Sequence, residues 1–391
     1  MQTELQAFGR GRLSDLFGDL VIYRNLQPLD RRLSKIKVAL RDLDLSSDER
    51  PRKLEVSYAR VALWYANEAQ QKRNVADSLQ ELLFVGDTLF NDGRAFTNMI
   101  NEGKLRGSCF IGVEHPDDEA QICIDDDNIY GSNRWASLGS WAQWLVQEKG
   151  MKLDQGTVVI VDIDKCALGA RGRNDTVIDR ARIQGAYRTM SKLLGKRFDG
   201  SEFEAYYNEL NQPRYHCLTQ DNQDYLAYIC LVLSTGLLTL NEIMEEIDKG
   251  HMDNFEQFTR LVETRLVISP GNASVLREPH DAVTTGLRNG DPTPFKRFRR
   301  QEFIATVERM GQMEDDAGAA ELLANEITLT EEIWELAEWL KARGCLLLCL
   351  SDKPDEASCP HRYESPDLPP IHQAETHRVG TSIKDALDAI G

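Results

Sequence analysis

The sequence predicts an α/β fold, in which a doubly wound parallel sheet carries a mostly α-helical domain inserted between two of its strands. Short continuous apolar runs, typical of buried parallel strands, each end in a chemically distinctive turn. Segments with helical spacing lie between these runs, and such alternation is typical of a parallel sheet covered by helices. The long stretch 176–330 has helical patterns and few β-rich runs, which predicts the inserted domain.

Apolar runs place the strands, and a period near 3.6 residues places the helices. We expect strands at residues 20–23, 82–85, 158–161 and 345–350, and helices at 58–69, 94–102 and 331–341. In the insertion, residues 181–194, 225–247 and 255–267 are each expected to be helical. The expected domains are a core of residues 1–150, a core strand and loop at 151–175, the helical domain at 176–330 and a final core part at 331–391.

Composition restricts the function classes. The 391 residues suffice for two domains, and 41% hydrophobic with 28% charged residues is typical of a globular protein. The net charge of −17 opposes general binding to nucleic acids or anionic membranes. With no apolar run long enough for a bilayer and no signal-peptide pattern, we expect a cytoplasmic protein without membrane or nucleic-acid partners. The 8 Cys are scattered, which predicts buried thiols rather than disulfides.

Acidic side chains follow two of the expected strands. Asp162 and Asp164 come directly after residues 158–161, and Asp87 and Asp92 follow residues 82–85. Taken singly, each pair could be a turn or a helix cap. Four carboxylates at one edge of a sheet would repel one another unless a divalent cation neutralised them, and oxygen-only ligands suit Mg²⁺. The pattern therefore predicts a magnesium site.

A metal-bound pair of carboxylates suits phosphoryl transfer. One carboxylate can attack an electrophile, while its neighbour protonates the leaving group and later activates water. The reaction also needs a cation and a hydroxyl or backbone donor for the phosphoryl oxygens. A lysine and Ser351, which follows the expected strand 345–350, could fill these roles.

These residues resemble the haloacid dehalogenase (HAD) superfamily, mostly Mg²⁺-dependent phosphohydrolases with a Rossmann-like core. Residues 158–166 resemble its first motif, which implies Asp162 as nucleophile and Asp164 as general acid/base. Residues 346–351 resemble the second, ending in Ser351. Residues 86–92 resemble the fourth, which implies that Asp87 and Asp92 join Asp162 and Asp164 as metal ligands.

The third motif, a lysine at a helix start, resembles the region of Lys53, with Arg52 or Lys72 as alternatives. The first motif departs from the family pattern at Lys165, where Gly is frequent, and at Cys166, where Thr or Val is usual. Both carboxylates of that motif are kept.

The motif order is three, four, one, two, whereas an ordinary member begins with motif one. Residues 16–53 resemble what normally follows motif two, so we expect a circular permutation. Residues 383–390 should then lie close to the first twenty residues. The alternative is two half-domains, with the missing parts supplied by another subunit.

The inserted domain follows motif one, where many HAD phosphatases carry a substrate-closing cap. Arg171 and Arg173 lie soon after the nucleophile and are expected to bind a phosphate. Within the insertion, residues 207–216 and 291–300 are rich in polar and aromatic groups. The basic cluster 296–300 could contact an anion or form a solvated face.

Two other patterns could hold a metal. Cys359, His361, His372 and His377 could in principle ligate zinc, although their spacing matches no standard finger. The acidic run 117–127 could be a solvated loop or a cation site.

The sequence thus predicts a Mg²⁺-dependent phosphatase that acts through an aspartyl-phosphate intermediate on a small phosphorylated metabolite. The alternatives are a non-catalytic binding or scaffold protein on the same core and a HAD-type phosphotransferase. The choice among sugar phosphates, nucleotides and other small phosphates, and the oligomeric state, stay open at this point.

Overall fold

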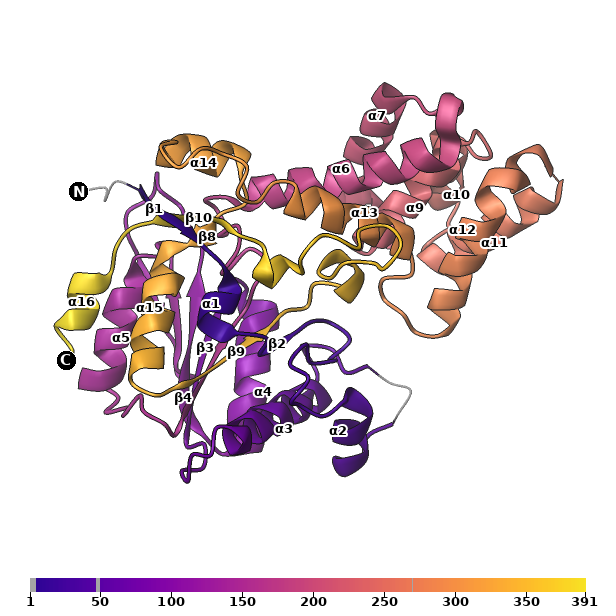
Figure 1. Cartoon of the computed structure of the whole chain (residues 1–391). Coiled ribbons are helices and arrows are strands. Elements are labelled where there is room, and N and C mark those ends of the chain that lie inside the picture. The colour runs from indigo at the N-terminus through magenta and orange to yellow at the C-terminus, as the bar shows by residue number, and fades with distance from the viewer. Residues whose placement is uncertain (1–4, 47–49, 269) are drawn as a thin grey trace. The chain divides into compact units, whose positions relative to one another are not determined.

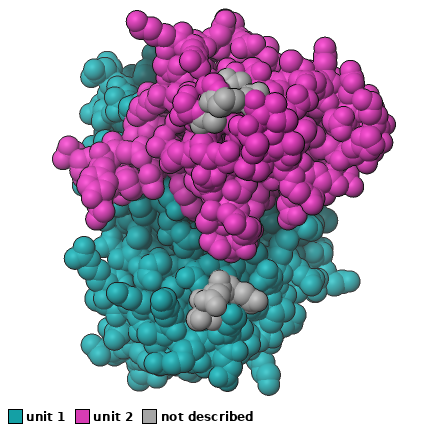
Figure 2. All heavy atoms as spheres, turned by 90° about the vertical axis from the view of Figure 1, so that its right-hand side faces the viewer, with its two compact units in different colours: residues 1–180, 306–359, 368–391 teal, residues 181–305, 360–367 magenta. Residues whose placement is uncertain are grey.

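The computed structural model describes residues 5–46, 50–268 and 270–391. The chain forms two compact units, shown in teal and magenta in Figure 2. The first unit comprises residues 1–180, 306–359 and 368–391, and the second comprises residues 181–305 and 360–367. Both unit boundaries near residues 180 and 305 fall inside helices, α6 (Asp175–Leu194) and α13 (Lys296–Val307).

The first unit is built on a seven-stranded sheet with the strand order β2-β9-β7-β3-β4-β6-β5. The strands are β2 (Val21–Ile22), β9 (Leu346–Leu350), β7 (Thr157–Val161), β3 (Glu81–Gly86), β4 (Arg106–Gly112), β6 (Ile129–Ser132) and β5 (Ile122–Ile124). All neighbours pair in parallel except β5 with β6. This sheet, with helices between its strands, confirms the predicted α/β class.

Helices cover both faces of the sheet. Figure 1 shows α3 (Val56–Lys72) and α4 (Arg94–Gly103) on one face, and α5 (Ser137–Gln147) with α15 (Glu331–Ala342) on the other. The short helix α2 (Ile36–Asp42) packs against α3, and α1 (Leu13–Phe17) packs against α15. Every residue of β3, β7 and β9 is buried. Burial on both faces explains why these strands are uninterrupted apolar runs rather than alternating ones.

A smaller sheet joins the two ends of the chain. Strand β10 (Thr376–Gly380) pairs antiparallel with β1 (Gln6–Gly11) and parallel with β8 (Leu329–Thr330). Gln6 lies opposite Gly380. Helix α16 (Lys384–Asp388) packs instead on α5 and α15. The chain ends therefore meet through residues 376–380, a few residues before the predicted segment 383–390.

Among the described residues of the second unit, the regular secondary structure is helical and there is no strand. Besides most of α6 and α13, its longer helices are α7 (Gly200–Leu210), α9 (Gln223–Ser234), α10 (Leu240–Asp248), α11 (Phe255–Ile268) and α12 (Pro270–Arg288). They enclose an apolar core of their own, which includes Phe203, Tyr228 and Phe258.

The prediction of one continuous helix at 225–247 is wrong, because the structure has two helices there, α9 and α10. Gly236 adopts φ +69°, a left-handed conformation that ends the first helix. Thr239 then begins the second, because its hydroxyl accepts the N–H of Glu242 and the Glu242 carboxylate accepts the N–H of Thr239. In the described part of the chain, no helix is long and apolar enough to cross a bilayer.

Candidate functional site

Three adjacent strands end level with one another and present the candidate residues. Val161 of β7 lies opposite Val85 of β3 and opposite Cys349 of β9. The backbone N–H of Asp162 continues the ladder by donating to the Val85 carbonyl at 2.9 Å. Asp162 is therefore fixed at the carboxyl end of the strand between β3 and β9, where α/β sheets place their ligands.

The turn after β3 folds Asp92 back toward the strand end. One carboxylate oxygen, Oδ2, accepts the N–H groups of Asp87 and Thr88 at 3.0 and 2.9 Å and the Thr88 hydroxyl at 3.0 Å. Gly86 makes this turn possible, since a Cβ at that position would lie 2.5 Å from Cγ of Asp92. The remaining oxygen of Asp92, Oδ1, is left for other partners.

Lys53 joins the two acidic segments. Its Nζ lies 2.5 Å from Oδ1 of Asp92 and 2.8 Å from Oδ1 of Asp162. The three side chains are only 4%, 1% and 7% exposed. Lys53 precedes α3, whereas the alternative Lys72 is the last of the 17 residues of that helix, about 25 Å along its axis. Of Lys53 and Lys72, it is therefore Lys53 that lies at the candidate site.

Three carboxylates converge beside this lysine. Oxygens of Asp87, Asp92 and Asp162 all lie within 4.8 Å of one another. Burial, together with Asp162 and Asp92, raises the pKa of Asp87 to about 9. Burial also raises the pKa of Asp162 to about 7, with Asp92 adding to the rise and Lys53 opposing it. Burial acts on Asp92 in the same direction, but Lys53 and the N–H donors outweigh it and lower the pKa of that carboxyl.

The cluster fits a divalent cation. Oδ1 of Asp92 is buried and, although it lies beside Lys53, accepts no well-directed hydrogen bond from the described residues. Burial, with the neighbouring carboxylates adding to it, raises the pKa values of Asp87 and Asp162, and a bound cation would stabilise their ionised forms. Carboxylate oxygens are ligands for Mg²⁺ and other hard divalent cations. Within the described ranges, this is the only group of three or more metal-ligating side chains.

Asp164 lies outside this triad and pairs with a second buried lysine. Nζ of Lys353 lies 3.0 Å from Oδ1 of Asp164, with the two side chains 2% and 25% exposed. Ser351 follows β9 and donates its backbone N–H to the Ile22 carbonyl. Its hydroxyl accepts the backbone N–H of Lys353. Sequence reasoning missed Lys353, although its position two residues after Ser351 was a signal.

Lys165, which departs from the motif that its segment resembles, has a local explanation. It adopts φ +63°, in the left-handed region that favours Gly. Its ammonium pairs with Asp179 of α6 at 2.9 Å. The Lys165 side chain is therefore held by α6. Its backbone still makes the turn that links Asp162 and Asp164 to the rest of the loop.

The two candidate arginines have different settings. Nη1 of Arg171 lies 3.0 Å from Oδ2 of Asp87, and the side chain is 38% exposed, so it stands at the edge of the acidic cluster. Arg173 is instead buried between Glu114 and Glu332, at 2.7 and 2.9 Å. Burial lowers the pKa of Arg173, but the two glutamates outweigh it and raise the pKa above its ordinary value. Arg173 is held within the fold and is not open to a substrate.

The histidines of the C-terminal segment each have a separate acidic neighbour. The pairs are His361 with Glu364, His372 with Asp19, and His377 with Glu326. In the acidic run 117–127, Oδ1 of Asp125 accepts the N–H groups of Asp127 and Ile129 and so shapes a turn.

Comparison with protein-family models, curated proteins and solved structures gives no match. The function must therefore be argued from the site itself.

Replacing Gly86 by Ala should disable the cation site without disturbing the sheet. The added Cβ would lie 2.5 Å from Asp92 Cγ and push that carboxylate away from Asp87 and Asp162. We expect Mg²⁺ or Mn²⁺ to raise the melting temperature of the wild type but not of this variant. Gly318→Ala is the matched control, because a Cβ there meets no atom within 4 Å. Equal cation-induced shifts in both variants would contradict the assignment.

Cation binding should strengthen as the pH rises. In the metal-free protein, Asp87 with a pKa of about 9 and Asp162 with a pKa of about 7 hold protons that a cation must displace. Between pH 6 and 8 the apparent Mg²⁺ affinity should therefore increase, by up to about tenfold per pH unit for each proton released. Calorimetric titration at pH 6, 7 and 8 measures this. An affinity independent of pH would mean that the triad does not bind the metal.

Proposed function

We propose that this chain is a Mg²⁺-dependent phosphohydrolase of the HAD type, which forms an aspartyl phosphate on Asp162. The observation that carries the proposal is the Lys53 ion pair with both Asp92 and Asp162. It connects three sequence motifs that lie far apart in the chain. The strands before Ser351, Asp162 and Asp87 are the neighbours β9, β7 and β3, which supports a shared site at one sheet edge.

The strand order also supports the proposed permutation. Residues 16–53 resemble the segment that follows motif two in ordinary members, and β2 within them pairs in parallel with β9, the strand of motif two. The pairing of β1 with β10 brings the chain ends together, as a permuted chain requires.

In the proposed reaction, a carboxylate oxygen of Asp162 attacks phosphorus. The bond from that oxygen to phosphorus forms, and the bond from phosphorus to the leaving oxygen breaks. Asp164 gives its proton to the leaving oxygen and then takes one from the water that hydrolyses the aspartyl phosphate, so free phosphate and Asp162 are regenerated. A cation held by Asp87, Asp92 and Asp162 would neutralise charge on the phosphoryl oxygens.

The lysines have distinct proposed roles. Lys53 favours the ionised form of Asp162 and keeps its carboxylate oriented. Lys353 lies next to Asp164, so a phosphoryl oxygen could attract its ammonium. Without that ammonium beside it, Asp164 more readily takes up a proton from solvent and can then act as the acid, while the Ser351 hydroxyl offers a donor to the same phosphoryl group.

Hydrolysis of p-nitrophenyl phosphate by the purified chain, with Mg²⁺ or with EDTA, tests the proposal. We expect turnover only with the metal, and an acid-quenched reaction should carry one phosphoryl group on the peptide that contains Asp162. Turnover that is unaffected by EDTA, or a phosphoryl group on another residue, would overturn the mechanism. A cation-stabilised protein without turnover on any phosphate ester would favour the binding-protein alternative.

A further inference from the structure

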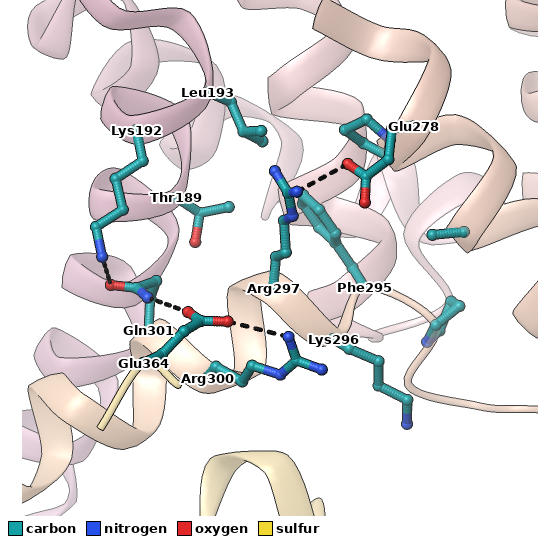
Figure 3. A pocket seen from close by; sticks show the side chains of 13 residues that line it. Thr189, Lys192, Leu193, Glu278, Phe295, Lys296, Arg297, Arg300, Gln301 and Glu364 are labelled. Atoms are coloured by element: carbon teal, nitrogen blue, oxygen red, sulfur yellow. Dashed lines mark hydrogen bonds and ion pairs between the residues drawn. The ribbon is translucent and has the colours of Figure 1, made fainter. Parts of the chain in front are cut away.

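The helical unit contains a cavity of about 600 Å³, a volume typical of small-molecule sites. Helices α6 and α12, the start of α13 and Glu364 line it (Figure 3). All lining residues belong to the second unit. The cavity is therefore a feature of that unit alone and does not depend on the acidic cluster of the first.

The lining combines basic and apolar residues. Lys192, Lys296, Arg297 and Arg300 are opposed by Glu278 and Glu364 in the lining and by Asp291, which pairs with Lys296, so one positive charge is left in excess. Leu193, Pro279, Pro294 and Phe295 supply apolar surface. In a chain with a net charge of −17, such a positive cavity is a local exception.

The sequence of α13 puts these cations where a helix disfavours them. Positive charge is unfavourable at a helix N-terminus, yet α13 begins with Lys296 and Arg297 and has no acid in its first turn. Residues from other segments hold the charges: Asp291 lies 2.9 Å from Lys296, and Glu278 lies 3.1 Å from Arg297. A local conflict of this kind is typical of a functional site.

The two arginines of the cavity are ion-paired but keep capacity for further hydrogen bonds. Arg300 pairs with Glu364 at 3.0 Å through Nη1, while its Nε is buried without a hydrogen-bond partner among the described residues. In Figure 3 the Arg297 side chain extends from α13 toward Glu278, close to the Phe295 ring. The Arg297 side chain is 48% exposed, so it is accessible to a ligand.

We propose that this cavity binds a small phosphate-bearing ring compound, at a site that shares no residue with the proposed catalytic centre. The excess of positive charge favours an anion, and the guanidinium groups of Arg297 and Arg300 suit phosphate oxygens. The ring would pack on the apolar part of the lining, beside the partly buried Leu193. This inference stands independently of the proposed hydrolysis, because no residue of the acidic cluster takes part.

Calorimetric titration of the full chain with phenylphosphonate, which cannot be hydrolysed as an ester, tests the site in metal-free buffer. We expect saturable binding that weakens with added KCl. Arg297→Gln and Arg300→Gln should each weaken it at least tenfold. Arg277→Gln, which removes an arginine paired with Glu263 on the same helical unit, should change it less than twofold. Asp162→Asn should also leave it unchanged.

Two further measurements sharpen the test. Glu364→Gln should strengthen binding several-fold, because it removes the carboxylate that competes for Arg300. Benzenesulfonate, with one charge, and inorganic phosphate, without a ring, should each bind more weakly than phenylphosphonate. The absence of saturable binding, or binding lost in Asp162→Asn but kept in both arginine variants, would overturn the proposal. Circular dichroism of each variant ensures that a loss reflects the site and not unfolding.

Discussion

Asp162→Asn should lower the Mg²⁺-dependent hydrolysis of p-nitrophenyl phosphate by about four orders of magnitude or more, the scale seen when an enzyme loses its nucleophile. The amide oxygen that replaces the carboxylate is a poor nucleophile and also a weaker metal ligand. Steady-state rates at saturating Mg²⁺ measure the loss. Asp154→Asn is the control, since Asp154 lies before the amino end of β7 and accepts the Gly156 N–H at 2.9 Å; it should keep full activity.

The Asp162→Asn variant should stay folded. The pKa of Asp162 is raised to about 7 in the folded protein, so its ionised form is disfavoured relative to the unfolded chain. The sign follows from linkage: the contribution of such a group to stability is present at low pH and is lost as the pH rises toward 7. At pH 8 the Asn variant should therefore melt no lower than the wild type. If the variant has a lower melting temperature and also loses activity, unfolding would explain the loss equally well. Rates measured at temperatures below its melting range distinguish the two causes.

The Asp164→Asn variant should distinguish the role of Asp164 from that of Asp162, because its loss of activity should depend on the leaving group. General acid catalysis contributes typically 10²- to 10⁴-fold, and it matters least when the leaving group is already stable as an anion. We expect a small loss with p-nitrophenyl phosphate and a much larger one with an alkyl phosphate. Equal losses with both esters would assign the proton donor to another residue.

Burial decides which strands the sequence can predict. The residues of β3, β7 and β9 are all buried, so each is an apolar run that composition alone reveals. Strands β4, β6 and β5 were missed, because β4 mixes Arg106 and Gly107 with apolar residues and all three residues of β5 are exposed. Edge strands carry little of the hydrophobic pattern from which strands are inferred.

The candidate site divides in a similar way. The aspartates that follow predicted strands converge because the strands are neighbours in register, and Lys53, predicted from the resemblance of its region to the third motif with Arg52 or Lys72 as alternatives, lies beside them. Lys353 and the burial of Arg173 were not foreseen. The partners of Arg173, Glu114 and Glu332, are 59 and 159 residues away, and only the folded chain brings them together. Sequence spacing fixes local chemistry, whereas long-range ion pairs depend on packing.

Lys53→Met should destabilise the metal-free protein by about 3 to 5 kcal/mol, the usual loss when one partner of a buried ion pair is removed. Methionine keeps most of the side-chain volume, so the loss reflects charge rather than a cavity. Asp92 and Asp162, 1% and 7% exposed, would be left as buried carboxylates without their ammonium. Urea unfolding at pH 7.5 in EDTA measures the change, and Lys72→Met at the far end of α3 is the control.

The double variant Lys53→Met, Asp92→Asn distinguishes the ion pair from simple packing. If Lys53 acts by compensating buried charge, removing one of the two carboxylates should restore a large part of the stability lost in the single variant. If it acts only by filling space, the two losses should add. Mg²⁺ should likewise restore part of the stability of Lys53→Met, because the cation supplies positive charge to the same oxygens. Additive losses and no rescue by Mg²⁺ would together show that Lys53 and the cation do not share a site, and the proposed chemistry requires that they do.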